Sequence, residues 1–247
     1  MNLTREQLLR EMGLAPSWRL RSPPVDPSID PPGDLPVTVE ASDSPVISSS
    51  VPDHAVAVSA PPGMDWEELS ATVAGCTRCG LCAQRKQAVL GVGDQQADWL
   101  FVGEGPGAEE DERGEPFVGQ AGKLLDNMLK AIDLKRGDNV YIANAVKCRP
   151  PDNRTPEAEE TAACWPYLER QIELLQPRLI VALGRPAAQS LLQSEVKIGA
   201  ARGQLHRYKG IPVIVTYHPA YLLRNLPDKA KAWEDLCFMR STMQTLV

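Results

Sequence analysis

Four short, mostly continuous apolar segments stand out between residues 99 and 217. They span residues 99–103, 140–146, 179–184 and 213–217. Continuous apolar runs of this length are typical of strands that are buried on both faces, whereas half-exposed strands alternate apolar and polar positions. The pattern therefore predicts four strands of a buried, mainly parallel sheet.

Helical patterns of apolar residues separate and follow these strands, at residues 119–132, 156–175, 186–192 and 229–243. The segment Thr155-Pro156-Glu157 has the order of an N-cap, a first-turn proline and an acidic first turn. Strands that alternate with helices favour a parallel sheet covered by helices on both faces. We therefore expect an α/β fold.

The N-terminal segment, residues 1–65, differs from the rest in composition, because it holds half of the 22 prolines and no lysine. Residues 22–65 show neither a helical nor a strand period, which predicts a disordered linker. Ahead of it, Thr4-Arg-Glu-Gln7 resembles a helix capping box, followed by a short apolar stripe. This helix-prone segment, residues 1–21, either packs on its own domain or binds a protein partner. The folded domain is predicted at residues 66–247.

Charge is distributed unevenly along the chain. The net charge of −6 argues, taken as a whole, against a protein that binds polyanions. However, residues 1–65 carry four arginines against nine Asp and Glu, a net −5, and the rest of the chain carries only −1. Residues 197–247 hold eight basic side chains and three acidic ones. The C-terminal part therefore has the charge that a nucleic-acid surface needs.

The chain has no apolar run near the roughly 20 residues of a membrane span, and its start lacks the pattern of a secretory signal. We expect a cytoplasmic protein with no membrane partner. Thiols stay reduced in the cytoplasm, so the six cysteines indicate a metal or catalytic site rather than disulfides.

Four cysteines have the spacing of a metal site. Cys76 and Cys79 form a Cys-x-x-Cys pair, and fifteen residues separate Cys148 from Cys164. Four thiolates bind either zinc or an iron–sulfur cluster, and the spacing alone leaves both open. Thioredoxin-type redox chemistry is disfavoured because no strand precedes Cys76.

The two remaining cysteines have other interpretations. Cys82 lies three residues beyond Cys79 and is an alternative ligand. Cys237 falls in an apolar helical segment and is expected in the core.

Candidate chemistry follows the predicted strands. The glycine-rich loop Gly103-Glu-Gly-Pro-Gly107 follows the first, Asn144 lies near the end of the second, and His218 ends the last. Ligands of open α/β sheets bind at the carboxyl ends of strands, so these residues are expected to share a site. Each alone also fits a structural role: an ordinary glycine turn, an asparagine bonded to backbone, or a surface histidine. Phe117, flanked by glycines, is a candidate stacking platform.

Taken in order, several motifs resemble family 4 uracil-DNA glycosylases, the iron–sulfur type, over about residues 70–245. They are Gly103-Glu-Gly-Pro-Gly107, Gly114-Glu-Pro-Phe-Val-Gly-Gln-Ala-Gly122, residues 144–151 and His218-Pro-Ala-Tyr-Leu-Leu-Arg224, with the four cysteines. The resemblance implies a three-layer α/β/α sandwich with a central, mainly parallel four-stranded sheet. It also implies a [4Fe–4S] cluster on Cys76, Cys79, Cys148 and Cys164, with zinc as the alternative.

The activity that the resemblance implies is removal of uracil from DNA, which starts base excision repair of deaminated cytosine. Phe117 would stack on the flipped uracil, Asn144 would hydrogen-bond its Watson–Crick edge, and His218 would stabilise the departing anion. Glu104 and Glu110 would orient the attacking water or stabilise the sugar cation. Gly105 would line the pocket where other glycosylase families carry an acidic residue.

The residues after His218 suit DNA contacts. Leu222 is the expected apolar wedge, with Leu223 as the weaker candidate, and Arg224 would hold a phosphate. Uracil-containing DNA is then the partner, and a monomer is expected. One alternative is a non-catalytic or covalent uracil-DNA binder of the same superfamily, although residues 111–122 lack the histidine of such relatives. Another is an electron-carrying cluster protein, which would leave Phe117, Asn144 and His218 without a shared purpose.

Overall fold

The structure is a computed structural model, and it describes residues 63–246. The helix-prone segment 1–21 and most of the predicted linker lie outside the described residues. The first described helix is α2 (Trp66–Ala74), and its N-cap is Asp65, the last residue of that linker. Asp65 Oδ1 accepts hydrogen bonds from the backbone N–H groups of Glu67 and Glu68, each at 2.9 Å. This cap fixes where the helix begins.

The centre of the fold is a six-stranded sheet in the order β1-β3-β2-β4-β6-β5. Its strands are β1 (Val92–Gly93), β2 (Trp99–Gly103), β3 (Val140–Asn144), β4 (Leu179–Leu183), β5 (Leu205–Tyr208) and β6 (Ile211–Thr216). The four central strands pair in parallel, which confirms the predicted four-stranded parallel core. The edge strands β1 and β5 pair antiparallel and were not predicted. β1 has only two residues and β5 is largely exposed, so neither has a buried apolar run.

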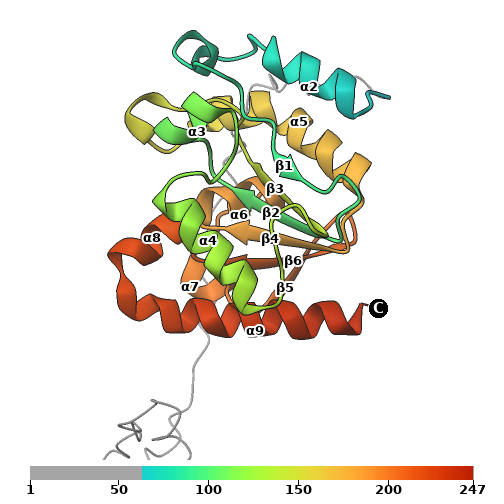
Figure 1. The fold of residues 1–247 in the computed structure, drawn as a ribbon, viewed down its shortest axis with the longest axis vertical. Coiled ribbons are helices and arrows are strands. Elements are labelled where there is room, and N and C mark those ends of the chain that lie inside the picture. The colour runs from blue at the N-terminus through green and yellow to red at the C-terminus, as the bar shows by residue number, and fades with distance from the viewer. Residues whose placement is uncertain (1–62, 247) are drawn as a thin grey trace, which may run out of the picture. The chain divides into compact units, whose positions relative to one another are not determined.

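Helices cover both faces of this sheet (Figure 1). One face packs against α5 (Ala158–Leu175), α6 (Arg185–Leu192) and α7 (Ile198–Ala201). The other packs against α4 (Gln120–Ala131), α8 (Pro219–Arg224) and α9 (Lys229–Thr245). Successive strand residues alternate between the faces, so Leu100 of β2 packs toward α5 while Phe101 packs toward α4. This is the predicted three-layer α/β/α sandwich.

Helix α5 begins two residues later than the sequence pattern predicts. Its N-cap is Glu157 rather than Thr155, and the backbone N–H of Glu157 donates to Glu160 Oε2 at 2.8 Å. Arg154 binds both carboxylate oxygens of Glu160, at 2.7 and 2.8 Å. The bidentate pair holds the segment before the helix extended, so the proline lies just outside the first turn.

Shorter helices interrupt the loops at the carboxyl side of the sheet. They are α3 (Ala108–Arg113), η1 (Gly80–Ala83), η2 (Pro151–Asn153) and η3 (Leu226–Asp228). The acidic segment after the first glycine loop forms α3. Within it Asp111 is only 3% exposed and accepts a hydrogen bond from the backbone of Lys86 at 2.9 Å.

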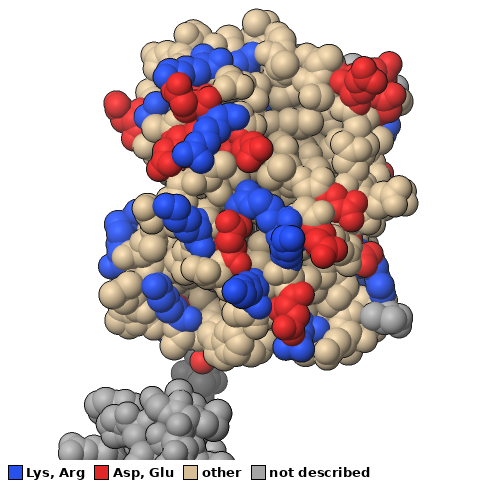
Figure 2. Space-filling view, in the orientation of Figure 1, with Lys and Arg blue, Asp and Glu red and all other residues tan. Residues whose placement is uncertain are grey.

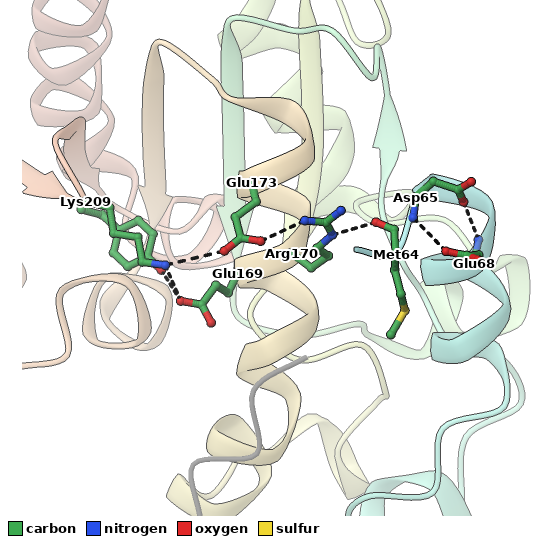
Figure 3. A network of polar contacts seen from close by, with 8 residues as sticks. Met64, Asp65, Glu68, Glu169, Arg170, Glu173 and Lys209 are labelled. Carbon is green, nitrogen blue, oxygen red and sulfur yellow. Dashed lines mark hydrogen bonds and ion pairs between the residues drawn. The ribbon is translucent and has the colours of Figure 1, made fainter. Parts of the chain in front are cut away.

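A third apolar cluster lies outside the sheet and joins α2, η1 and α5. It includes Leu69 and Val73 of α2, Leu81 of η1, and Tyr167 of α5. Arg170 of α5 also donates to the backbone oxygen of Met64 at 2.7 Å (Figure 3). These contacts attach the segment before β1 to the outer side of α5. Among the described helices, none is long and apolar enough to cross a membrane.

Candidate active site

A cavity of about 640 Å³ opens at the carboxyl ends of the central strands. Seven of the predicted site residues line it: Glu104, Gly105, Glu110, Phe117, Asn144, His218 and Arg224. Thr155, Arg185 and Tyr221 also line it and were missed by sequence reasoning. Arg185 begins α6, Tyr221 lies in the first turn of α8 and Thr155 lies in the loop before α5, all at the carboxyl edge, which is the signal that could have found them.

Asn144 is the last residue of β3 and is 2% exposed. Its Oδ1 is buried and has no hydrogen-bond partner among the described residues. Buried polar atoms are nearly always paired, because an unpaired one costs about 1–3 kcal/mol. An unpaired acceptor that faces a cavity is what a site needs if its ligand supplies the missing donor.

Gly103 explains how Asn144 and Phe117 lie so close together. It ends β2 opposite Asn144 in the parallel register. A Cβ on Gly103 would lie 2.4 Å from Asn144 Oδ1 and 2.6 Å from Phe117 Cζ. The missing side chain therefore makes room for an amide and an aromatic ring at the same point of the cavity wall.

Phe117 is 6% exposed, and its ring centroid lies 5.5 Å from that of His218. Its backbone has φ +55°, a left-handed conformation that aromatic residues rarely adopt. Such a conformation persists only where the surrounding structure imposes it. The neighbouring hydrogen bonds of Glu110 supply that constraint.

Glu110 lies in α3, and its carboxylate accepts three backbone hydrogen bonds. Oε1 accepts from Val118 at 2.9 Å and from Gly119 at 3.1 Å, and Oε2 accepts from Gly107 at 3.1 Å. Val118 and Gly119 immediately follow Phe117. Glu110 thus joins the glycine loop to the start of α4 and fixes the turn that presents Phe117. This arrangement favours a positioning role over the predicted contact with the attacking water.

His218 lies two residues after β6, which ends at Thr216, and is the N-cap of α8. Its Nδ1 accepts a hydrogen bond from the backbone N–H of Ala220 at 3.1 Å. That bond assigns the ring proton to Nε2. The pKa of His218 is lowered from 6.5 to about 4. Burial is the largest cause, the nearby charge of Arg224 acts in the same direction, and Glu110 opposes the shift. At neutral pH the imidazole is therefore uncharged and has one N–H to donate.

Glu104 follows β2 in the glycine loop. Burial raises its pKa, and a hydrogen bond from Thr155 and the charge of Arg185 partly offset that effect. At the next position, a Cβ on Gly105 would lie 2.8 Å from Val146 Cγ2. Glycine therefore lets the loop lie flat against the segment after β3, and it leaves Glu104 as the carboxylate of this wall.

The structure corrects the predicted DNA wedge. Leu222 is 1% exposed and packs in the core under α4 and α9, so it is not available to DNA. Leu223 is 40% exposed, and Arg224 lines the cavity. Because α8 turns the chain by about 100° per residue, only one of two adjacent leucines faces the core. Leu223 is the exposed one.

Five cysteines line a second, small cavity between α2, η1, the segment after β3 and α5: Cys76, Cys79, Cys82, Cys148 and Cys164. Cys148 and Cys164 are buried, at 5% and 7% exposed. Arg85 Nη1 donates to Cys148 Sγ at 2.9 Å, and the backbone N–H of Lys147 donates to Cys164 Sγ at 3.2 Å. These donors stabilise sulfur in its anionic, ligating form.

Burial raises the pKa of Cys79, Cys148 and Cys164, the last to about 12. Among the described residues, no three His, Cys, Asp or Glu side chains lie close enough together to hold one metal ion. Cys237 is exposed on α9, so its predicted place in the core is wrong. The side of that helix that packs on the sheet carries Ala232, Leu236 and Met239 instead.

Comparison with known proteins identifies the family. Residues 90–237 match the family model of the Uracil DNA glycosylase superfamily. The chain is 44% identical over 181 residues to a type-4 uracil-DNA glycosylase of Pyrobaculum aerophilum, covering 70% of this chain and 92% of the relative. It is 48% identical over 167 residues to a type-4 uracil-DNA glycosylase of Thermotoga maritima, covering 67% and 86%. The order of the motifs around the cavity and the length of these matches agree, and the chain belongs to the type-4 uracil-DNA glycosylases.

Proposed function

We propose that this chain is a monofunctional uracil-DNA glycosylase, which hydrolyses the N-glycosidic bond of a flipped uracil and so starts base excision repair of deaminated cytosine. The observation that carries the proposal is the buried, unpaired Oδ1 of Asn144 in a cavity that Phe117 and His218 also line. The relatives bear the same activity in their names.

Asn144 selects the base. Uracil presents an N3–H donor beside its O4 acceptor, whereas cytosine presents an N3 acceptor beside an amino donor. The Oδ1 of Asn144 accepts from N3–H, and its amide nitrogen donates to O4. A cytosine in the same place would leave Oδ1 facing an acceptor, which costs affinity because both groups are desolvated. The ring of Phe117 provides the stacking face for the base.

His218 stabilises the leaving group. Breaking the glycosidic bond puts negative charge on the uracil, and the Nε2–H of a neutral imidazole donates to the O2 side of that anion. A neutral donor that is fixed by the Ala220 bond needs no proton transfer at the moment of reaction. Glu104 is the carboxylate that orients water or stabilises the cation-like sugar, and Glu110 fixes the Phe117 turn.

DNA would lie across α4, α8 and α9. Figure 2 shows lysine and arginine side chains over the part of the face where Figure 1 draws these helices. Lys123 and Lys130 of α4 and Lys229 of α9 are exposed, and Arg224 of α8 lies at the cavity. They supply phosphate contacts, and the exposed Leu223 supplies the wedge that fills the gap left by the base.

The cysteine cavity is proposed to hold a [4Fe–4S] cluster through Cys76, Cys79, Cys148 and Cys164, with a zinc ion as the alternative. Four thiolates hold such a cluster, and five cysteines surround this one cavity. Hydrogen bonds to the cluster's sulfurs set its properties, and Arg85 and the backbone of Lys147 already donate to two of these thiols. The cluster would act as a structural crosslink between α2, the segment after β3 and α5.

A purified chain of this kind should contain about four irons, with inorganic sulfide. Cys164→Ser should lose iron and visible absorbance. Cys82→Ser is the matched control in the same cavity and should retain both. Zinc in place of iron would support the zinc alternative, and iron loss from the Cys82 variant alone would contradict the ligand set.

The proposed activity belongs to residues 66–247, acting as a monomer in the cytoplasm, where thiols stay reduced. A protein partner for residues 1–21 is proposed from the sequence pattern alone, because that segment lies outside the described residues.

The test is release of free uracil from a uracil-containing oligonucleotide, leaving an alkali-labile abasic site. Asn144→Ala should lose most of the activity while its melting temperature stays the same or rises, because the unpaired Oδ1 is removed. No uracil release by the wild-type chain with its cysteine site loaded would overturn the proposal. A protein–DNA band that survives denaturation would instead support a covalent uracil-DNA binder.

A further inference from the structure

A buried lysine connects the two cavities. Lys147 is 1% exposed and lines the cysteine cavity, although it lies only three residues after Asn144. Its Nζ donates to the backbone oxygen of Asn144 at 2.8 Å and to Gln171 Oε1 at 2.5 Å. Both acceptors are neutral oxygens. The negative charges nearest to this ammonium are Cys148 and Cys164 of the same cavity in their ligating form, and they favour the charged lysine. A buried ammonium is tolerated only where such charges and its hydrogen bonds offset the cost of its lost water.

Every polar group of Lys147 is used. In addition to the two bonds of its Nζ, its backbone N–H donates to Cys164 Sγ at 3.2 Å, and its carbonyl accepts from the backbone N–H of Val89 at 2.7 Å. The residue is therefore fixed on three sides, by the segment before β1, by α5 and by the end of β3. It has little freedom to move independently of any of them.

Gln171 makes the anchor on α5 rigid. It is 0% exposed, and its amide nitrogen donates to the backbone oxygen of Leu90 at 3.0 Å and to the Tyr141 hydroxyl at 3.3 Å. Gln171 also lies seven residues after Cys164, which is two turns along the same face of the helix. The helix that carries a cysteine of the second cavity thus also carries the acceptor that holds Lys147.

The backbone of Asn144 depends on this anchor. Beyond β3 the chain leaves the sheet, and its last pairings are Ala145 N–H to Gly103 O at 2.9 Å and Val146 N–H to Glu104 O at 3.1 Å. The carbonyl of Asn144 is held by the Lys147 ammonium instead. Rotation of that peptide would carry the Asn144 side chain away from the base, and a misplacement of about 1 Å can reduce a rate on the order of a hundredfold.

We propose that Lys147 is a positioning residue for uracil recognition, which couples the orientation of Asn144 to the α5 helix and the cysteine cavity. The inference rests on the proposed function and deepens it. It predicts that the preference for uracil, rather than general affinity for DNA, depends on this buried ammonium.

The experiment compares full-length wild type, Lys147→Met and Lys209→Met, each purified with its cysteine site loaded. Methionine keeps the length of the side chain and removes the charge. Lys209 is the control, because it also bridges to α5, through Glu169 at 2.8 Å and Glu173 at 3.7 Å (Figure 3), but it is exposed and its ammonium is not bonded to Asn144. The probes are two otherwise identical duplexes, one with non-cleavable 2′-fluoro-2′-deoxyuridine and one with a tetrahydrofuran abasic site.

Lys147→Met should reduce the ratio of uracil to abasic affinity by about tenfold or more, with a similar fall in the single-turnover rate of uracil release. Its affinity for abasic DNA and its iron content should match wild type, and Lys209→Met should change neither ratio nor rate. A purely structural role would lower the melting temperature and leave the affinity ratio intact. An unchanged ratio in Lys147→Met, or a ratio that falls only together with iron, overturns the proposal.

Gln171→Met decides the question if Lys147→Met does not fold. It removes only the α5 acceptor, so the affinity ratio should fall in the same direction by a smaller factor, and an unchanged ratio overturns the proposal. A wild-type chain that neither prefers the uracil duplex nor releases uracil would refute the proposed function itself. A wild-type chain that does both, beside a Lys147 variant that keeps the preference for uracil, would refute only the role of Lys147.

Discussion

At the residue scale, the conformation of Phe117 depends on a carboxylate seven positions earlier in the chain. Glu110 holds the two peptide N–H groups that follow Phe117 and one in the glycine loop. We expect Glu110→Gln to lower the free energy of unfolding by roughly 1–3 kcal/mol, because an amide nitrogen meets the Gly107 N–H. Uracil release should fall by about tenfold or more as the ring loses its place. Denaturant unfolding and single-turnover kinetics measure the two effects.

Glu115→Gln is the control for that prediction. Glu115 is exposed in the same loop, so its neutralisation tests whether negative charge alone matters. We expect neither stability nor rate to change. Equal rate losses in the two variants would show that the charge of the loop, not the clamp, is what Glu110 contributes.

The uncharged state of His218 gives a pH prediction. Its pKa is about 4 in the folded protein, and near 6.5 in the unfolded chain. Between these values the unfolded state binds more protons, so this residue makes stability fall as the pH falls from 6.5 toward 4. The melting temperature of wild type should therefore drop more steeply across this range than that of His218→Gln. Parallel curves would contradict the lowered pKa.

The pH dependence of activity tests the protonation state of His218 independently. Because the neutral ring is the donor, the single-turnover rate of wild type should show no loss on acidification through pH 6.5. A rate that titrates with a pKa near 6.5 would show that His218 takes up a proton as readily as a solvated histidine does.

Single residues differ in how far the sequence predicted them. Asn144, Phe117 and His218 lie beside strand ends or glycines, so their positions followed from the α/β pattern and the motifs. The clamp by Glu110 depends on a left-handed backbone at Phe117, and the anchor by Lys147 depends on complete burial of a lysine. Neither has a signature in the sequence, because both arise from segments that meet only in the folded chain. The choice between Leu222 and Leu223 likewise needed the helix phase of α8.

At the element scale, the site exists because four parallel strands end at one edge of the sheet. The residue that follows β4 is a glycine, and the packing of His218 requires that it has no side chain. Gly184 has φ +91°, and a Cβ there would lie 3.0 Å from His218 Cβ. The backbone after β4 thus leaves room for the imidazole of His218, which follows β6.

Gly184→Ala should therefore impair both stability and activity. Gly184 has φ +91° and ψ 173°, a conformation nearly confined to glycine, so alanine there costs about 1–3 kcal/mol, and its methyl group would also push against His218. Gly210→Ala is the matched control, since Gly210 has φ +86° but its added Cβ meets nothing within 4 Å. Both variants should lose similar stability, and only Gly184→Ala should lose uracil release. A comparable loss of activity in Gly210→Ala would show that the effect is one of folding.

The elements that sequence reasoning predicted are those with one dominant period. The four central strands are continuous apolar runs, and α4, α5, α6 and α9 lie where the helical patterns placed them. The sequence patterns missed β1, β5 and α3, which are short or polar, and they also missed the helices α2, α7 and α8. Edge strands pair on one side only and face solvent, so they need no apolar run. The acidic α3 is held by its caps and by the buried Asp111 rather than by an apolar stripe.

At the scale of the whole molecule, the cysteine cavity and the cavity at the strand ends share one segment, from the end of β3 onward, and this segment is bonded to helix α5, which lines the cysteine cavity. The segment contains Asn144, Lys147 and Cys148, and the helix contains Cys164 and Gln171. A cluster in the cysteine cavity would therefore stiffen the wall that is proposed to read the base. The sequence showed both sets of residues, but only their spatial connection explains why one chain carries both.

Net charge also has a different meaning for the whole chain than for its parts. Most of the −6 belongs to residues 1–65, whereas residues 197–247, which include α8 and α9, are net +5.

A shortened chain beginning at Gly63 keeps the Asp65 cap and every described helix and strand, and it loses most of the excess negative charge. At low salt it should bind uracil-containing DNA as tightly as the full chain or more tightly, because repulsion of the phosphates is reduced. The difference should vanish as salt screens the charges, and the rate of uracil release should be unchanged. Binding titrations of both chains over a range of salt concentrations measure this, and weaker binding by the shortened chain would mean that the removed N-terminal segment contacts DNA or supports the fold despite its charge.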